Sequence, residues 1–212
     1  MISDKVYKEY LDFLLQGNRL TCTHIVRNLI DQSVPIKTLY TDLFQKSLYR
    51  VGELWEFNRI SVAKEHLATA ITEGLLSLTY PMLFDVEQDE QRKKMIISCA
   101  ANEYHQIGGK MVADICELNG WDTHFLGANT PVDQMLEHIQ EVKPQLVGLS
   151  LSVYFNIASL KKEIEVIRSN FTDLDIFIGG QAFQWGGIDI IKKYPRAEYM
   201  PSLDKLERAL SK

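Results

Sequence analysis

The stretch Met95-Ile-Ile-Ser-Cys-Ala-Ala-Asn-Glu103-Tyr-His105-Gln-Ile-Gly108 decides the fold of this chain. Its apolar start (95–100) predicts a buried strand, and a helical pattern begins near Ile107. His105 should therefore stand in a loop at the carboxyl end of a strand, where open α/β sheets bind ligands. An imidazole can bind a metal through one ring nitrogen while a carboxylate such as Glu103 accepts from the other. The plainer alternative is a solvated loop histidine.

Beyond this stretch, short apolar runs alternate with helical patterns, which predicts right-handed βαβ units and a parallel sheet. The expected strands are 95–100, 123–126, 146–151, 176–178 and a weak 198–200, and the expected helices are 107–118, 131–142, 157–170, 188–193 and 203–210. Thr130-Pro-Val-Asp133 resembles a capping box, and Ser202 can cap the last helix. The predicted fold class is α/β, with a Rossmann-like (flavodoxin-like) domain over residues 95–212.

The residues before it predict a different domain, because apolar positions recur at helical spacing and strand-like alternation is missing. Four amphipathic helices with short connections predict a four-helix bundle over residues 1–84. Thr21 and Ser61 are candidate caps of the second and fourth helices. The fourth helix should turn Ala63, Leu67, Ala70, Ile71, Leu75 and Leu78 inward. The charged segment 85–94 is the predicted linker.

Charge and composition exclude several classes of function. The chain of 212 residues has a net charge of −5, which argues against direct nucleic-acid binding. No apolar run is long enough to span a bilayer, and the first residues lack the features of a secretory signal. The three cysteines, Cys22, Cys99 and Cys116, lack metal-site spacing and indicate buried thiols in a reducing compartment. We therefore expect a cytoplasmic protein with no membrane association.

Two more loops at predicted strand ends carry candidate site residues. Ser150 and Ser152 follow the third strand, and Gly179 and Gly180 follow the fourth. The hydroxyls can donate to a ligand, and the glycines permit positive φ and close approach to the backbone. Each motif also has a purely local explanation: serines that bond their own backbone, and a simple turn after a strand.

Together, Glu103-x-His105-x-x-Gly108, Ser150-x-Ser152 and Gly179-Gly180 resemble the cobalamin-binding domain of methionine synthase, corrinoid proteins and mutases. The resemblance implies that His105 binds cobalt from below in place of the cofactor's own base (base-off, His-on). The nucleotide tail would then pass Ser150, Gly179 and Gly180, and Tyr104 could lie under the corrin. Glu103 replaces the family's aspartate and Ser152 a bulkier residue, but neither departure threatens binding.

The helical domain adds a second resemblance. Trp55-x9-Glu65-His66 is similar to the cap motif of cobalamin-dependent photoreceptors, which are light-responsive transcriptional regulators. The resemblance implies that Trp55 covers an adenosyl group while Glu65 and His66 bind its ribose and adenine. The alternative is that Trp55 is core and that Glu65 and His66 form a solvated first turn. Glu56 follows Trp55, where some photoreceptors have a histidine that can become the upper cobalt ligand.

The other histidines and tryptophans have ordinary interpretations. We expect His24 on a helix and His124 in a strand, both in core or surface roles, and His138 at a solvated helix position. Trp121 and Trp185 should pack, although Trp185 follows the glycine pair and could line the tail pocket.

The leading functional prediction is a cobalamin-binding light sensor, not an enzyme, that regulates transcription or signalling through a protein partner or a homo-oligomer. No DNA-binding domain precedes the bundle in this sequence, so an output partner is expected. Adenosylcobalamin is the expected cofactor, with methylcobalamin or hydroxocobalamin as alternatives. The competing prediction is a corrinoid methyl carrier of a methyltransferase system. A mutase small subunit and a domain that binds no cofactor remain open.

Overall fold

The computed structural model describes residues 1–83 and 92–211 and divides into two compact units, Met1–Asp85 and Val86–Lys212. We call them the helical unit and the α/β unit. Most of the predicted linker, 85–94, lies outside the described residues, and Lys94 already belongs to the first strand. No helix within the described ranges is long and apolar enough to cross a membrane.

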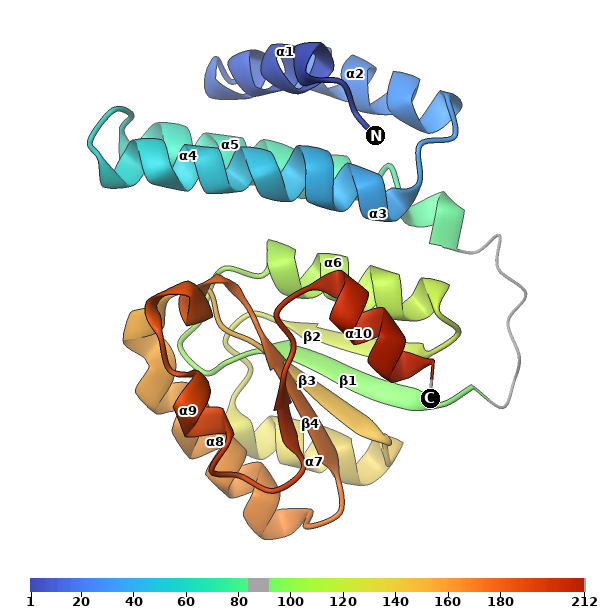
Figure 1. Cartoon of the computed structure of the whole chain (residues 1–212), viewed down its shortest axis with the longest axis vertical. Helices are drawn as coiled ribbons and strands as arrows, with labels where there is room; N and C mark the ends of the chain where they lie inside the picture. The colour runs from blue at the N-terminus through green and yellow to red at the C-terminus, as the bar shows by residue number, and fades with distance from the viewer. Residues whose placement is uncertain (84–91, 212) are drawn as a thin grey trace. The chain divides into compact units, whose positions relative to one another are not determined.

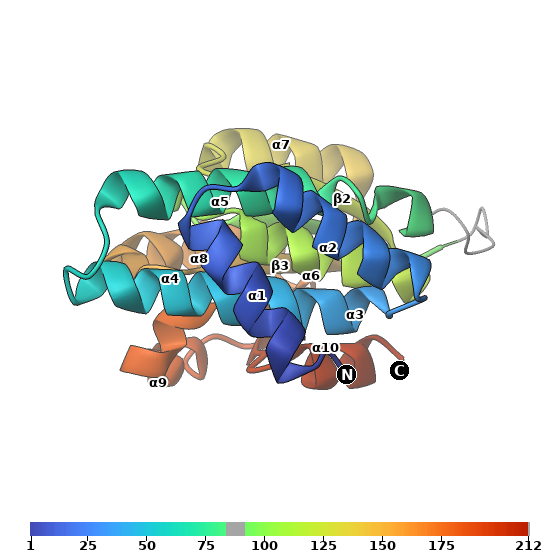
Figure 2. The same cartoon turned by 90° about the horizontal axis from the view of Figure 1, so that it is seen from above.

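The helical unit contains the four predicted long helices (Figures 1 and 2). The third is continuous from residue 36 to residue 56 but includes a π-helical segment, of a kind often found at functional sites. The core of the helical unit comes from all four helices and includes Tyr10, Val26, Phe44 and Ile71. The elements are α1 (Asp4–Leu15), α2 (Arg19–Asp31), α3 (Ile36–Thr38), η1 (Leu39–Gln45), α4 (Lys46–Glu56), α5 (Val62–Leu76) and the 3₁₀ turn η2 (Tyr80–Leu83).

Two details of the helical unit correct the predictions. Asn18, not Thr21, caps α2, because its side chain accepts a hydrogen bond from the Thr21 N–H at 3.1 Å. The first half of α5 turns Ala63, Leu67 and Ala70 to the surface instead of inward, while Ala68, Ile71, Thr72, Leu75 and Leu76 are buried. The predicted cap of α5 is confirmed, since Ser61 accepts from the Lys64 N–H.

The α/β unit is built on a five-stranded parallel sheet with the order β2-β1-β3-β4-β5. This is the flavodoxin-like order: β2 lies on one side of β1 and the later strands are added on the other side, so the strand order reverses between β1 and β3. The strands are β1 (Lys94–Cys99), β2 (Asp122–Gly127), β3 (Leu146–Ser150), β4 (Asp175–Gly179) and β5 (Ala197–Tyr199). Ligands of such sheets bind outside the carboxyl ends of the strands at the switch point, which here lies beside Glu103 and His105.

Helices cover both faces of this sheet (Figure 1). Ile96, Val147 and Ile178 pack on one side against α7 (Val132–Val142), α8 (Ile157–Asn170) and α9 (Ile188–Ile191). Met95 and Ile97 pack on the other side against α6 (Ile107–Leu118) and α10 (Leu203–Leu210). The short 3₁₀ turns η3 (Tyr154–Asn156) and η4 (Gln181–Trp185) follow β3 and β4. Successive side chains of a strand point to opposite faces of the sheet, and helices cover both faces, so the unit has three layers.

One predicted cap in this unit is confirmed and one is wrong. Ser202 caps α10, since its hydroxyl accepts from the Lys205 N–H. The capping box at Thr130 does not form, because Pro131 occupies the N-cap position and the Thr130 hydroxyl instead donates to the Leu126 carbonyl.

Candidate functional site

Glu103 is the centre of the candidate site. It is fully buried in the loop between β1 and α6, and one of its oxygens, Oε1, lies 2.5 Å from His105 Nδ1. Oε1 also accepts from the His105 N–H at 3.0 Å, and Oε2 accepts from the N–H groups of Ser152 and Val153 at 2.9 and 2.8 Å. One carboxylate therefore ties the loop after β1 to the loop after β3.

The charge of Glu103 fixes the tautomer of His105. Burial by itself raises the pKa of Glu103, but hydrogen bonds from the His105 ring and from the His105 and Val153 N–H groups outweigh it and lower this pKa to about 2. An ionised carboxylate only accepts, so the proton between the two groups belongs to Nδ1. Nε2 then carries the lone pair that a metal would take, on a side chain that is 58% exposed.

Asparagines that no sequence motif had indicated hold this loop from outside. Asn102 and Asn129 both have positive φ, and the Asn102 N–H donates to the Asn129 side chain at 3.0 Å. Asn156 donates to the Asn102 carbonyl, and the Asn102 amide donates to Ser159 at the start of α8. The available signal was an asparagine two or three residues after a strand end, because asparagine tolerates the αL conformation in turns.

The glycines of the site differ in how closely other atoms would approach an added Cβ. A Cβ at Gly108 would meet nothing within 4 Å, so no neighbour among residues 1–83 and 92–211 requires glycine at this exposed position. Gly180 has φ of +117°, and a Cβ there would lie 2.1 Å from the Leu151 carbonyl oxygen. Gly179 is less tight, at 3.2 Å from the Met200 carbonyl. The fold itself thus explains Gly180, whereas Gly108 leaves open space beside His105.

Ser150 lies below the first turn of α6, where the buried Gly109 allows close packing. A Cβ at Gly109 would lie 3.6 Å from Ser150 Cβ and 3.2 Å from the Phe125 ring. Ser152 contributes its backbone N–H to Glu103. The three predicted loops after β1, β3 and β4 therefore do meet at one edge of the sheet: Glu103 bonds the β3 loop, and the Leu151 N–H bonds the Gly179 carbonyl at 2.9 Å.

Aromatic side chains lie exposed around this edge. Tyr104, next to His105, is 70% exposed, and its hydroxyl accepts from the Asn129 amide. Tyr154 and Phe155 in η3 are exposed as well. Trp185 is 56% exposed, so the prediction that it packs is wrong, whereas Trp121 is buried as predicted.

In the helical unit, Trp55 lies in the last turn of α4, and Glu65 and His66 lie in the first turns of α5. The short connection between these antiparallel helices brings all three to one end of the bundle. Trp55 is 48% exposed and is therefore not a core residue. Glu65 accepts from Thr69 at 3.0 Å and lies 3.6 Å from His66 Nε2.

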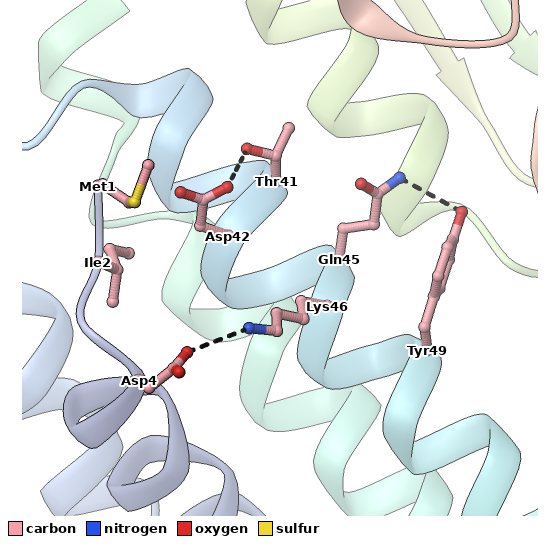
Figure 3. Close-up of a pocket in the computed structure, with 8 residues that line it drawn as sticks. All are labelled: Met1, Ile2, Asp4, Thr41, Asp42, Gln45, Lys46 and Tyr49. Carbon is pink, nitrogen blue, oxygen red and sulfur yellow. Dashed lines mark hydrogen bonds and ion pairs between the residues drawn. The ribbon is translucent and has the colours of Figure 1, made fainter.

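The helical unit also has an open hollow of about 460 Å³ between the first residues and the third long helix (Figure 3). Lys46 reaches Asp4 at 3.9 Å, and Gln45 donates to Tyr49 at 3.3 Å. None of the predicted site residues lines this hollow; its lining is Met1, Ile2, Asp4, Thr41, Asp42, Gln45, Lys46 and Tyr49.

The candidate site offers a single imidazole, which suits a metal ion that a macrocyclic cofactor already coordinates. Among residues 1–83 and 92–211, no group of three or more His, Cys, Asp or Glu side chains is arranged to hold a metal ion. A corrin ring supplies four cobalt ligands by itself, so the protein needs to add only one. The three cysteines are buried thiols, as predicted, and burial raises the pKa of Cys99 to about 12.

Two family models match the chain, and both are described as a B12 binding domain. One matches residues 93–196 and the other residues 6–79. Among solved structures, the monomethylamine corrinoid protein of Methanosarcina barkeri aligns over 99% of both chains with a TM-score of 0.83 and 15% identity. That likeness shows a shared fold across the helical and α/β units.

Sequence relatives include transcriptional repressors and corrinoid proteins. The HTH-type transcriptional repressors CarA and CarH of Myxococcus xanthus are 31% identical over 93 residues (43% of this chain) and 22% identical over 162 residues (74%). The chain spans about a third of the length of CarA and about half that of CarH. The dimethylamine corrinoid protein of Methanosarcina barkeri is 18% identical over 169 residues, which cover 79% of this chain and 78% of the relative. With one model matched over residues 6–79 and the other over residues 93–196, the chain carries both B12 binding domains, in order.

Proposed function

We propose that this protein binds cobalamin at the carboxyl edge of its parallel sheet, with His105 Nε2 as the lower ligand of cobalt. The contact between Glu103 and His105 carries the proposal. It fixes the ring through Nδ1, raises the basicity of the imidazole and directs Nε2 away from the carboxylate. Gly108 supports it, because no described residue fills the open space beside this glycine.

The nucleotide tail would run beside Ser150, Ser152, Gly179 and Gly180, on loops that Glu103 and the backbone hold together. Exposed Tyr104 would lie against the underside of the ring. In the helical unit, Trp55, Glu65 and His66 would contact the upper ligand, with the exposed Trp55 ring covering an adenosyl group.

The function that we propose for this binding is light sensing, with output through a protein partner or a change in oligomeric state. A bound alkylcobalamin would supply a light-sensitive cobalt–carbon bond. Loss of contacts to Trp55 and Glu65 would then bias the helical unit between two states. The exposed Trp55, at the same end of the bundle as Glu65 and His66, supports this function over simple storage of the cofactor.

A methyl carrier is the second candidate, and two observations favour it. Full-length fold similarity runs to a monomethylamine corrinoid protein, and a dimethylamine corrinoid protein is matched over most of its length. A carrier would use the same His105 ligation and would need a methyltransferase as partner, whereas it has no evident need for the Trp55, Glu65 and His66 group.

Absorption spectroscopy separates the two functions. The purified chain is mixed in the dark with adenosylcobalamin or with methylcobalamin and then illuminated with green light, with size-exclusion chromatography before and after. A spectral change coupled to a change in assembly or partner binding supports a light sensor. Methylcobalamin binding without any light-dependent change in assembly, and loss of the methyl group only with a methyltransferase, supports the carrier. An unchanged spectrum in His105→Ala would overturn the lower-ligand assignment.

A further inference from the structure

The two histidines of the α/β unit outside the candidate cobalamin site lie against each other. His124 Nδ1 and His138 Nε2 are 3.2 Å apart, and the ring centroids are 5.2 Å apart at an interplanar angle of 53°. Both side chains are about one-third exposed, at 30% and 31%. The prediction that His138 is simply a solvated helix residue is therefore wrong.

The core of the unit enforces this pairing. His124 lies in β2, the edge strand, next to Leu126 on the face that packs against α7. His138 precedes Ile139 in α7 and follows Met135 by three positions, so it borders the helix's buried stripe. Met135 and Ile139 are 0% and 2% exposed and hold the helix on the sheet.

The far nitrogen of each imidazole faces a carboxylate. His124 Nε2 lies 3.8 Å from Asp122 Oδ1, and His138 Nδ1 lies 3.8 Å from Glu141 Oε2. Histidines that bind metals typically present one nitrogen to the ion and the other to a carboxylate. The two near nitrogens therefore face each other, and each imidazole has a carboxylate on its far side.

We propose that His124 Nδ1 and His138 Nε2 together bind one divalent transition-metal ion of the kind that prefers imidazole, with Zn²⁺ as the test ion. At Zn–N distances of about 2.0–2.1 Å, two nitrogens of a tetrahedral ion are separated by about 3.3 Å, close to the observed 3.2 Å. Because no third ligand from the described residues is in place, water completes the coordination. The site is thus an open one, of lower affinity than a closed structural zinc site.

The site does not depend on cobalamin, and its test can be kept separate. Zn²⁺ alone is titrated into the tag-free, cobalamin-free full chain by isothermal calorimetry, and the imidazole proton resonances are followed by NMR. We expect one equivalent to shift the resonances of both His124 and His138, and either His124→Gln or His138→Gln to weaken that binding at least tenfold. His24→Gln, which removes an exposed histidine of α2, is the matched control and should leave it unchanged.

His105 is an exposed imidazole that could also take up Zn²⁺, so the titration is repeated in His105→Gln. Retention of the His124 and His138 shifts in that variant supports the proposal. The proposal fails if Zn²⁺ leaves both resonances of the wild-type protein unmoved, which would make the pair a simple hydrogen bond. It also fails if the variant lacking both histidines, shown to be folded by circular dichroism, binds the same equivalent with the same affinity.

Discussion

Glu103 Oε1 lies 2.5 Å from His105 Nδ1, while the other oxygen of the same buried carboxylate accepts two backbone N–H groups from the loop after β3. A single side chain thus orients the imidazole and joins two loops of the sheet edge. Removing its charge should affect both the stability of the α/β unit and the orientation of His105.

Glu103→Gln should change how stability depends on pH. Because the pKa of Glu103 is lowered from 4.5 to about 2 by folding, its contribution is present above pH 4.5 and is lost as the pH falls towards 2. The size of that contribution is about 3 kcal/mol. Urea unfolding of the cobalamin-free protein between pH 3 and pH 7 should show a steep fall for the wild type and a flatter profile for the variant. Parallel profiles would contradict the assignment of the carboxylate.

Gly108→Ala should separate folding from cofactor binding. Alanine in the first turn of α6 meets no neighbour and favours the helix, so thermal stability without cobalamin should stay equal or rise, by up to about 1 kcal/mol. Cobalamin affinity should fall at least tenfold if the ring lies against this glycine. Equal affinity in the variant and the wild type would show that the ring lies elsewhere.

Gly180→Ala is the comparison variant, for which we expect a loss of stability even without cobalamin. The added Cβ would overlap the Leu151 carbonyl, and φ of +117° is unfavourable for alanine, so the loops that follow β3 and β4 must move apart. We expect the variant to lose several degrees of melting temperature even without cobalamin. An unchanged melting temperature would contradict the close approach of Gly180 to the Leu151 carbonyl.

Trp55→Ala tests the predicted role of the helical unit. About half of the Trp55 surface is already exposed, so the substitution should cost little stability. Affinity for adenosylcobalamin, measured by spectral titration in the dark, should fall much more than affinity for hydroxocobalamin, because only the former has an adenosyl group for Trp55 to cover. Equal losses for both would indicate that Trp55 only packs.

Periodicity was enough to predict the sheet and the helices around it. Apolar runs located all five strands within one residue at each end, and Ile107–Leu118, Ile157–Asn170 and Leu203–Leu210 have the predicted bounds. The errors occur where a local choice depends on tertiary contacts. Leu67 has helical spacing with Ile71, yet lies 47% exposed because the helix turns its Ala68 and Thr72 side inward instead.

The site was predictable only in part, for a similar reason. The motif located Glu103 and His105, but nothing local reveals that Glu103 bonds Ser152 and Val153, which lie about 50 residues away. Glu163 was missed altogether, because a glutamate in the amphipathic pattern of α8 is normally solvated, whereas here it lies under the loop that leads to His105.

Glu163→Gln should stabilise the protein at alkaline pH. Glu163 is fully buried; Oε2 accepts from the Ala101 N–H at 3.0 Å, and Oε1 has no hydrogen-bond partner among the described residues. Burial, only partly opposed by the Ala101 N–H, raises the pKa of Glu163 from 4.5 to about 7. Folding therefore favours the protonated acid, and stability is lost as the pH rises from 4.5 through 7, by about 3 kcal/mol.

A glutamine at position 163 keeps an acceptor for Ala101 and never ionises. The variant should match the wild type near pH 5 and exceed it at pH 8, measured as the free energy of unfolding in urea without cobalamin. Glu137→Gln, which neutralises an exposed glutamate of α7, is the control and should not change the pH profile. If the variant were no more stable than the wild type at pH 8, Glu163 would have to be ionised and solvated, and the loop above it packed differently.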